Sequence, residues 1–114
     1  MNCFKNYSEE HEIKRLKELY DYEILDTPNE ESIDAITKLI QGICEVPICV
    51  VSLIDEKRQW FKSKQGMEIE STSREISFCD YAIKQDELME IQNALEDERF
   101  KNNPFVQNSP PILF

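Results

Sequence analysis

Glycine and histidine, two residues that many active sites rely on, are scarce: the chain has two glycines and one histidine among 114 residues. It therefore has no Gly-rich loop to hold a phosphate and no HExxH metal motif. No nucleophile has an evident base beside it, because His11 is the sole imidazole and lies in a charged segment. The sequence predicts a protein that is not an enzyme by itself.

Long hydrophobic runs and positive charge are also lacking. The longest apolar stretch, from 46 to 53, is interrupted by Pro47 and Ser52 and falls far short of the roughly 20 residues of a membrane helix. The N-terminus has no pattern of a secretory signal. With 13 Lys and Arg against 23 Asp and Glu, the net charge is −10, which disfavours nucleic acid and anionic membranes as partners. We expect a cytoplasmic protein with neither partner.

The four cysteines, at positions 3, 44, 49 and 79, form no CxxC pair and no small disulfide framework. Reduced thiols and no structural metal are therefore expected. A redox role for Cys44, Cys49 or Cys79 stays open, because sequence spacing does not reveal whether two sulfur atoms lie within bridging distance. The sequence identifies no cofactor.

Two amphipathic helices are predicted ahead of the sheet. Ser8 caps the first, whose apolar stripe consists of Ile13, Leu16, Leu19 and Tyr20. The second, from about 28 to 44, is indicated by Thr27 as cap, Pro28 at the first position and Glu30 as the returning acid of a capping box. Its apolar side chains are expected to face the core: Ile33, Ile36, Leu39, Ile40 and Ile43.

Two strands, 48–54 and 59–64, are predicted to pair as an antiparallel hairpin, because a short polar turn joins two runs of strand-forming residues. Along the second strand, Trp60 and Phe61 are expected on opposite faces, with Lys62 and Lys64 on the face of Trp60. A positive φ is expected where this strand ends, at Gly66.

The rest of the chain is predicted to form short elements. Ser77 caps a helix, with Asp80 as a second capping group and Phe78, Ala82 and Ile83 as its inward residues. Residues 88–91 are predicted as a brief strand, 97–111 as an irregular loop and 112–114 as the start of a further strand. This order predicts an α+β fold with a mainly antiparallel sheet.

Five segments resemble, in order, the GAF family of sensor domains: ILDTP, VPICVVSLID, RQWFKSKQG, REISFCDYAI and DERFKNNPFV. The likeness extends over residues 12–114, which leaves residues 1–11 as an N-terminal extension. It implies a GAF-like central sheet with helices on both faces. It also implies a small-molecule-binding sensory module of a bacterial signalling protein, of the histidine kinase or cyclic-dinucleotide synthase type.

Compared with that family, the sequence stops early, so residues 12–114 are interpreted as a partial GAF domain without its final strands and closing helix. The resemblance implies a homodimer and an output domain in a longer chain. Two other functions stay open. One is a ligand-free dimerisation or scaffold module, suggested by the apolar stripe of the first helix. The other is a cysteine-based free methionine sulfoxide reductase, which shares the GAF fold.

Four residues are candidates for binding a small-molecule ligand: Cys79, Tyr81, Arg99 and Phe100. Cys79 opens a helix, whose dipole favours a thiolate, although buried cysteines more commonly act as small apolar residues. Arg99 offers a fork for an anion beside Phe100, or forms a local pair with Asp97 that stiffens the loop.

Three further interpretations concern a covalent chromophore, Trp60 and the pair of Arg74 and Glu75. Tetrapyrrole-binding GAF domains attach their chromophore to a cysteine usually followed by histidine, whereas Cys79 is followed by Asp80, so no covalent chromophore is expected. Trp60 is interpreted as core rather than as pocket lining. Arg74 and Glu75 are interpreted as a solvated pair.

Overall fold

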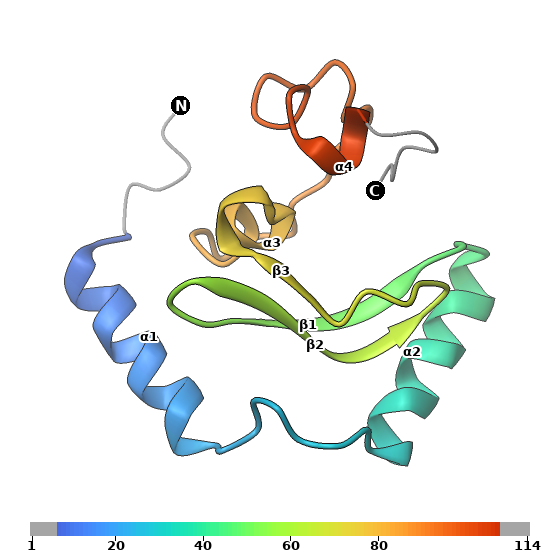
Figure 1. The fold of residues 1–114 in the computed structure, drawn as a ribbon. Helices are drawn as coiled ribbons and strands as arrows, with labels where there is room; N and C mark the ends of the chain where they lie inside the picture. The colour runs from blue at the N-terminus through green and yellow to red at the C-terminus, as the bar shows by residue number, and fades with distance from the viewer. Residues whose placement is uncertain (1–6, 108–114) are drawn as a thin grey trace.

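The structure, a computed structural model, describes residues 7–107, without the side chains of residues 105 and 107. Its elements are α1 (Glu9–Asp21), α2 (Glu31–Cys44), β1 (Cys49–Ile54), β2 (Arg58–Gln65), β3 (Ser71–Ser73), the 3₁₀ turn η1 (Arg74–Ile76), α3 (Phe78–Ala82) and α4 (Pro104–Gln107). The three strands form an antiparallel sheet in the order β1-β2-β3. Figure 1 shows α1 and α2 at opposite sides of the sheet and α3 above it. The predicted α+β class is confirmed, and the arrangement is compatible with a GAF-like fold.

The hairpin of β1 and β2 forms as predicted. Its turn is held by Asp55, whose Oδ1 accepts hydrogen bonds from the backbone N–H groups of Lys57 and Arg58, at 2.9 and 2.7 Å. Past the end of β2, Gly66 has the predicted positive φ, at 86°. A Cβ at this position would lie 1.9 Å from the carbonyl oxygen of Pro47. Glycine alone therefore allows the chain to pass so close to the segment before β1.

A β-bulge in β2 changes which side chains face each layer. Val51 pairs with Ser63 and Ser52 with Phe61, so Lys62 is an extra residue. Phe61, before the bulge, lines a cavity on one face. Ser63, after it, hydrogen-bonds to α2 on the other face. The extra residue thus lets two odd-numbered side chains of one strand point to opposite layers.

The bulge overturns part of the expected alternation. Trp60 pairs with Leu53, whereas Lys64 pairs with Val50, a residue of the cavity face. Paired side chains lie on the same face of an antiparallel sheet, so the side chains of Lys64 and Trp60 lie on opposite faces. The prediction that these two share a face is wrong, because a single inserted residue reverses the alternation beyond it.

The first turn of α2 also differs from the prediction. The helix begins at Glu31 rather than near residue 28, and its N-cap, Glu30, makes no side-chain cap hydrogen bond. The predicted capping box is replaced by Lys62, whose Nζ contacts Thr27 Oγ1 at 2.7 Å and Glu30 Oε2 at 2.8 Å. Lys62 is 1% exposed. A buried ammonium group needs oxygen partners. The side-chain oxygens of Thr27 and Glu30 therefore bind Lys62 instead of capping the helix.

The core-facing side of α2 is polar. Its buried residue is Thr37, whose Oγ1 lies 2.8 Å from Ser63 Oγ and accepts a hydrogen bond from Gln65 Nε2 at 3.2 Å. Ser63 Oγ also donates to Asp34 Oδ1 at 2.6 Å. Buried polar groups need such partners. The hydroxyl and amide groups of β2 therefore bring the polar side of the helix inward.

The apolar stripe of α2 consequently faces outward. Four of its five residues are exposed: Ile36 (54%), Leu39 (62%), Ile40 (43%) and Ile43 (72%). Only Ile33 is half-buried. The prediction that these residues face the core is wrong, because periodicity locates an apolar side of a helix without saying what covers it.

Beyond β2, local signals are only partly followed. Ser77 caps α3 as predicted, accepting from the N–H of Asp80 at 3.2 Å. The predicted strand 88–91 is wrong: Leu88 is 93% exposed, while Met89 and Ile91 pack against a cluster of Phe78, Ala94, Phe100 and Val106. Residues 88–91 thus form no strand, and their apolar side chains pack against this cluster. Within the predicted loop, Pro104 begins α4, a position that suits proline; the predicted strand 112–114 lies outside the described residues.

Candidate functional site

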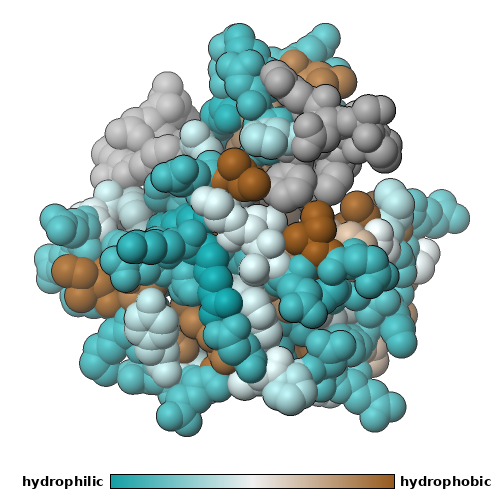
Figure 2. Space-filling model, viewed as in Figure 1, coloured by the Kyte–Doolittle hydropathy of each residue, from teal (hydrophilic) through white to brown (hydrophobic). Residues whose placement is uncertain are grey.

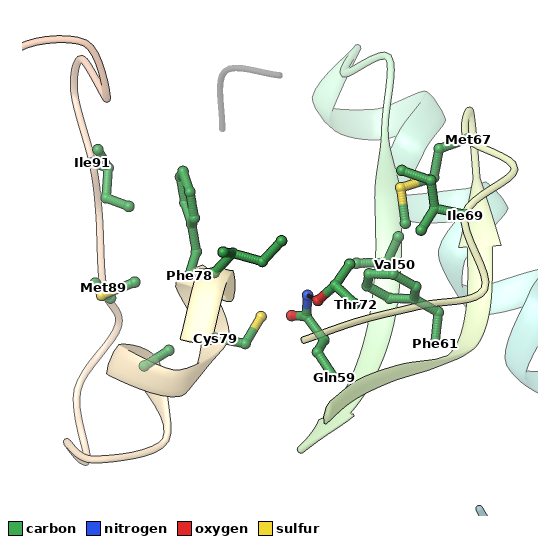
Figure 3. A pocket seen from close by; sticks show the side chains of 12 residues that line it. Val50, Gln59, Phe61, Met67, Ile69, Thr72, Phe78, Cys79, Met89 and Ile91 are labelled. Carbon is green, nitrogen blue, oxygen red and sulfur yellow. Dashed lines mark hydrogen bonds between the residues drawn. The ribbon is translucent and has the colours of Figure 1, made fainter. Parts of the chain in front are cut away.

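A cavity of about 250 Å³ lies between the sheet and α3. Figure 3 shows Val50, Gln59, Phe61 and Thr72 of the sheet on one side of it and Phe78 and Cys79 of α3 on the other. Met67 and Ile69, from the connection between β2 and β3, close one end, and Met89 and Ile91 lie behind α3. Nine of the twelve lining residues are apolar and none is charged.

The polar groups of the cavity wall bind one another. Gln59 Nε2 donates to Thr72 Oγ1 at 3.1 Å, and Gln59 Oε1 accepts from Ser77 Oγ at 2.9 Å. Ser52 Oγ donates to Cys79 Sγ at 3.1 Å. These bonds fix the amide of Gln59, which is 7% exposed. They also join β1, β2 and β3 to α3, so the wall is built from four elements.

Local sequence accounts for much of this geometry. The phase of β2 before its bulge aims Gln59 and Phe61 at the cavity, and the Ser77 cap orients α3 so that Cys79 faces the sheet. Most of the lining was missed by sequence reasoning. One signal was available: Met67 and Ile69 alternate with polar residues just after Gly66, as expected of a half-buried extended segment.

Three of the four candidate ligand-binding residues lie together outside the cavity wall, since the Arg99 guanidinium is 6.0 Å from the centroid of the Tyr81 ring and Phe100 contacts both. The fourth stands apart from them. Cys79 lines the cavity. Phe100 is 1% exposed and packs behind it, its ring 4.2 Å from Phe78 and 5.1 Å from Tyr81 between centroids. Tyr81 belongs to the same cluster. Neither aromatic ring lines the cavity, and a binding role for them stays a prediction.

Arg99 lies outside the cavity wall. Its Nη2 contacts Asp97 Oδ2 at 2.9 Å, and its guanidinium lies 5.1 Å from the centroid of the Phe100 ring. The hydrogen bond from Arg99 lowers the pKa of the Asp97 carboxyl below its ordinary value. The local pair is therefore present, and binding of an anion by Arg99 stays a prediction.

Arg74 connects α1 to the cavity side of the molecule. It bonds to Glu12 of α1, and its Nε donates to Asp80 of α3 at 2.7 Å. Hydrogen bonds from Arg15, then Arg74, lower the pKa of Glu12 to about 2 despite partial burial. The interpretation of Arg74 and Glu75 as a solvated pair is wrong, because α1 and α3 bring two carboxylates to the guanidinium.

On the opposite face, two cations of β2 hold the connection between α1 and α2. Arg58 forms two hydrogen bonds to the carboxylate of Asp26, at 2.9 and 2.6 Å. Lys62 Nζ donates to the carbonyl oxygen of Pro28 at 2.7 Å, besides its contacts with Thr27 and Glu30. The ILDTP segment is thus attached to the strand that also supplies Gln59 and Phe61 to the cavity.

Of the three cysteines that the structure describes, only Cys79 lines the cavity. Cys44, at the end of α2, is exposed, and Cys49 is half-buried. Within residues 7–107, no cluster of three or more His, Cys, Asp or Glu side chains is arranged to hold a metal ion. In the same part of the chain, no helix combines the length and the apolar content that crossing a membrane requires.

Comparison with known proteins points to a protein of bacterial signalling. No protein-family model matches the chain. It is 36% identical, over 91 residues, to cyclic di-GMP phosphodiesterase PA2567 of Pseudomonas aeruginosa. The match covers 80% of this chain but 16% of that protein. The chain therefore resembles a small part of a protein of cyclic di-GMP signalling.

Proposed function

We propose that this chain is a sensory module of a signal-transduction protein, of the GAF type, which binds a small molecule in the cavity between the sheet and α3. The observation that carries the proposal is the cavity itself, about 250 Å³ in a domain of this size. The 36% identity to part of a cyclic di-GMP phosphodiesterase supports a role in signalling. A catalytic output domain, of the histidine kinase or cyclic-dinucleotide type, would then lie elsewhere in a longer protein.

The chemistry of the cavity wall favours binding over catalysis. Its hydroxyl and amide groups are engaged with each other, at Ser77, Gln59 and Thr72. Cys79 accepts a hydrogen bond from Ser52, a residue that is not a base. A nucleophile without an adjacent base is not activated in this way, so the proposal assigns no catalytic step to the chain.

Strand β2 offers a route by which occupancy of the cavity would reach the N-terminal helices. Gln59 and Phe61 line the cavity, while Arg58 and Lys62, beside them in sequence, hold the connection between α1 and α2. A shift of β2 on ligand binding would move those two anchors. A ligand that favours one arrangement of β2 would thereby bias the relative placement of α1 and α2.

The proposal is tested by thermal unfolding in the presence of a broad panel of metabolites. A ligand of the folded state raises Tm with concentration. Ala82→Phe places a ring in the cavity wall and should abolish that shift. Ala35→Phe, the same change on the exposed surface of α2, should keep it. No shift with any compound, or an equal shift in both variants, would contradict a ligand in this cavity.

The second candidate function, a homodimeric scaffold without a ligand, draws on the helix surfaces. Ile13 and Tyr20 of α1 are 63% and 49% exposed, and most of the apolar stripe of α2 is exposed as well. Figure 2 shows brown apolar side chains on the α1 side of the molecule, among teal hydrophilic ones. Exposed apolar residues of this kind favour pairing of two copies, whereas the net charge of −10 opposes it. A single monomeric species in sedimentation at high protein concentration would rule out this candidate.

A further inference from the structure

We propose that the cavity takes an uncharged, mainly apolar small molecule with one hydrogen-bond acceptor, and that it rejects cyclic nucleotides and other phosphate-bearing ligands. This inference rests on the proposed function, because it names the chemical class of ligand for the same site. Three properties of the cavity support it: the charge of its wall, its hydrogen-bonding capacity and its size.

The wall provides nothing to neutralise an anion. None of the twelve lining side chains is charged. Two nearby cations are engaged elsewhere, since Arg74 binds Glu12 and Asp80 and Arg58 binds Asp26 and Asp55. Lys64, on the cavity face of β2, is not one of the lining residues. A phosphate entering this space would lose its hydration without gaining a guanidinium or an ammonium group from the lining side chains. The net charge of −10 adds a repulsive field.

Besides the weak S–H donor of Cys79, the wall has one N–H donor to offer. The amide of Gln59 has two N–H groups, of which one is donated to Thr72. Its carbonyl oxygen already accepts from Ser77, and the Thr72 hydroxyl donates to the backbone oxygen of Ser73 at 3.1 Å. The second N–H of Gln59 therefore fits a carbonyl, ether or hydroxyl oxygen on an otherwise apolar ligand.

The volume fits a ligand larger than a single ring. At about 250 Å³, the cavity exceeds the roughly 150 Å³ engineered apolar cavity of another protein that stays dry and binds benzene. Phe61 and Phe78 offer ring faces. Met67 and Met89, with three rotatable bonds each, can adjust to the outline of a ligand. A two-ring aromatic compound or an aliphatic one of similar bulk matches this shape.

The test compares two ligands that share the naphthalene ring and differ in whether they carry a phosphate group. The uncharged dye N-phenyl-1-naphthylamine, which fluoresces strongly in apolar surroundings, is titrated into the chain and then displaced by 1-naphthol or by 1-naphthyl phosphate. We expect saturable dye binding, and displacement by 1-naphthol at a concentration at least about tenfold lower than by the phosphate. Cyclic AMP and cyclic di-GMP should leave the dye in place.

Two sets of variants assign the binding to the cavity. Ala82→Phe should lower dye affinity at least about tenfold, whereas Ala35→Phe on α2 should not. The double variant Leu39→Gln/Ile43→Gln removes two exposed apolar side chains, which are alternative places for dye to bind on the surface. Its dye affinity should equal that of the wild type. Gln59→Lys, or Val50→Lys if the former does not fold, should bring the affinity for 1-naphthyl phosphate up to that for 1-naphthol.

The outcomes separate this inference from the function on which it rests. If 1-naphthyl phosphate or a cyclic nucleotide displaces the dye as well as 1-naphthol does, and Ala82→Phe weakens binding, the cavity is a ligand site and the uncharged class is wrong. If the dye does not bind, or if Ala82→Phe binds dye as the wild type does, the inference of an uncharged apolar ligand in this cavity is wrong. The proposed function fails as well only if the metabolite panel gives no Tm shift, or an equal shift in Ala82→Phe and Ala35→Phe.

Discussion

One face of the sheet meets α3 and residues 88–91 mainly through apolar side chains around a cavity, with two side-chain hydrogen bonds to α3 and its cap. The other face meets α2 and the residues before it through hydroxyls, an amide and an ammonium group. Both faces draw on β2. On the cavity side, Phe61 stands beside open space. On the α2 side, Lys62 and Ser63 are 1% and 2% exposed and fully engaged in hydrogen bonds. The bulge between Phe61 and Ser63 produces this division.

The contrast separates two ways of holding a layer in place. Hydrogen bonds between fixed groups specify a geometry, so α2 and the ILDTP segment have a defined position on the sheet. Apart from the hydrogen bonds of Gln59 with Ser77 and of Ser52 with Cys79, the contacts around the cavity are apolar and tolerate rearrangement, because none requires a single partner. A ligand would therefore contact the cavity side of the sheet, which can adapt to it. A shift of β2 would then move α2 and the ILDTP segment, whose position on the sheet is fixed by hydrogen bonds.

The largest expected effect comes from breaking the hairpin that both faces share. Gly66→Ala should destabilise the chain by about 3 kcal/mol or more, since the left-handed conformation disfavours a side chain and the new Cβ would overlap the Pro47 oxygen. Gly42→Ala, in α2 with nothing within 4 Å of its Cβ, should stabilise by about 1 kcal/mol. Urea unfolding measures both; a similar effect for the two variants would contradict the role of Gly66.

The next prediction compares buried with exposed apolar side chains. Phe78→Ala removes a ring that is 8% exposed and stacked on Phe100, and it should cost about 3 kcal/mol of unfolding free energy. Leu39→Ala, in the outward stripe of α2 and 62% exposed, should stay within about 0.5 kcal/mol of the wild type. The two losses are measured from the midpoints of denaturant unfolding, provided that the variants keep the wild-type m-value. A large loss for Leu39→Ala would mean that the stripe is covered in solution.

The polar layer is tested by removing its ammonium group. Lys62→Met keeps the length of the side chain but leaves Thr27 Oγ1 and the Pro28 carbonyl without their donor, which should cost about 2 kcal/mol. Glu30 is 56% exposed in its side chain and regains water, so the penalty stays below that of a fully buried pair. Lys64 lies two residues further along β2, on the cavity face. Lys64→Met should change the free energy of unfolding by about 0.5 kcal/mol or less. Equal effects would remove the distinction between the two lysines.

The smallest predicted effect concerns pH and the attachment of α1 to the cavity side. The pKa of Glu12 falls from its ordinary 4.5 to about 2 in the folded chain. A lowered pKa stabilises the fold fully above 4.5, and this contribution is lost as pH falls toward 2. After allowance for partial solvent screening it amounts to roughly 1 to 2 kcal/mol. Glu12→Gln should flatten the stability profile in that interval, whereas Glu10→Gln, in an exposed pair, should follow the wild type.

Signals that act within a few residues were predicted correctly. The Ser8 and Ser77 caps, the hairpin of β1 and β2, and the positive φ of Gly66 all appear in the structure. Each depends on the geometry of one turn, which the local sequence specifies. Cys79, at the start of α3, was the one candidate site residue placed in the cavity wall.

Signals that depend on distant partners were misinterpreted. Thr27 and Glu30 have the spacing of a capping box, yet Lys62, more than thirty residues away, takes both. Arg74 stands next to Glu75 in sequence but binds Glu12. The stripe of α2 was assigned to the core because a hydrophobic period was assumed to face the nearest sheet. In each case the choice of partner depended on which groups the fold brought together.

The sequence by itself determined where α1, α3 and the hairpin lie and, apart from its first turn, where α2 lies. Capping groups, strand-forming runs and glycine act on the backbone within their own turn. Only the tertiary structure decided which side of α2 is buried, which side chains line the cavity and which carboxylates hold Arg74. One bulge at Lys62 exchanges the two faces of β2. Beyond that point, burial and hydrogen bonding depend on contacts between residues far apart in the chain, and no local pattern records them.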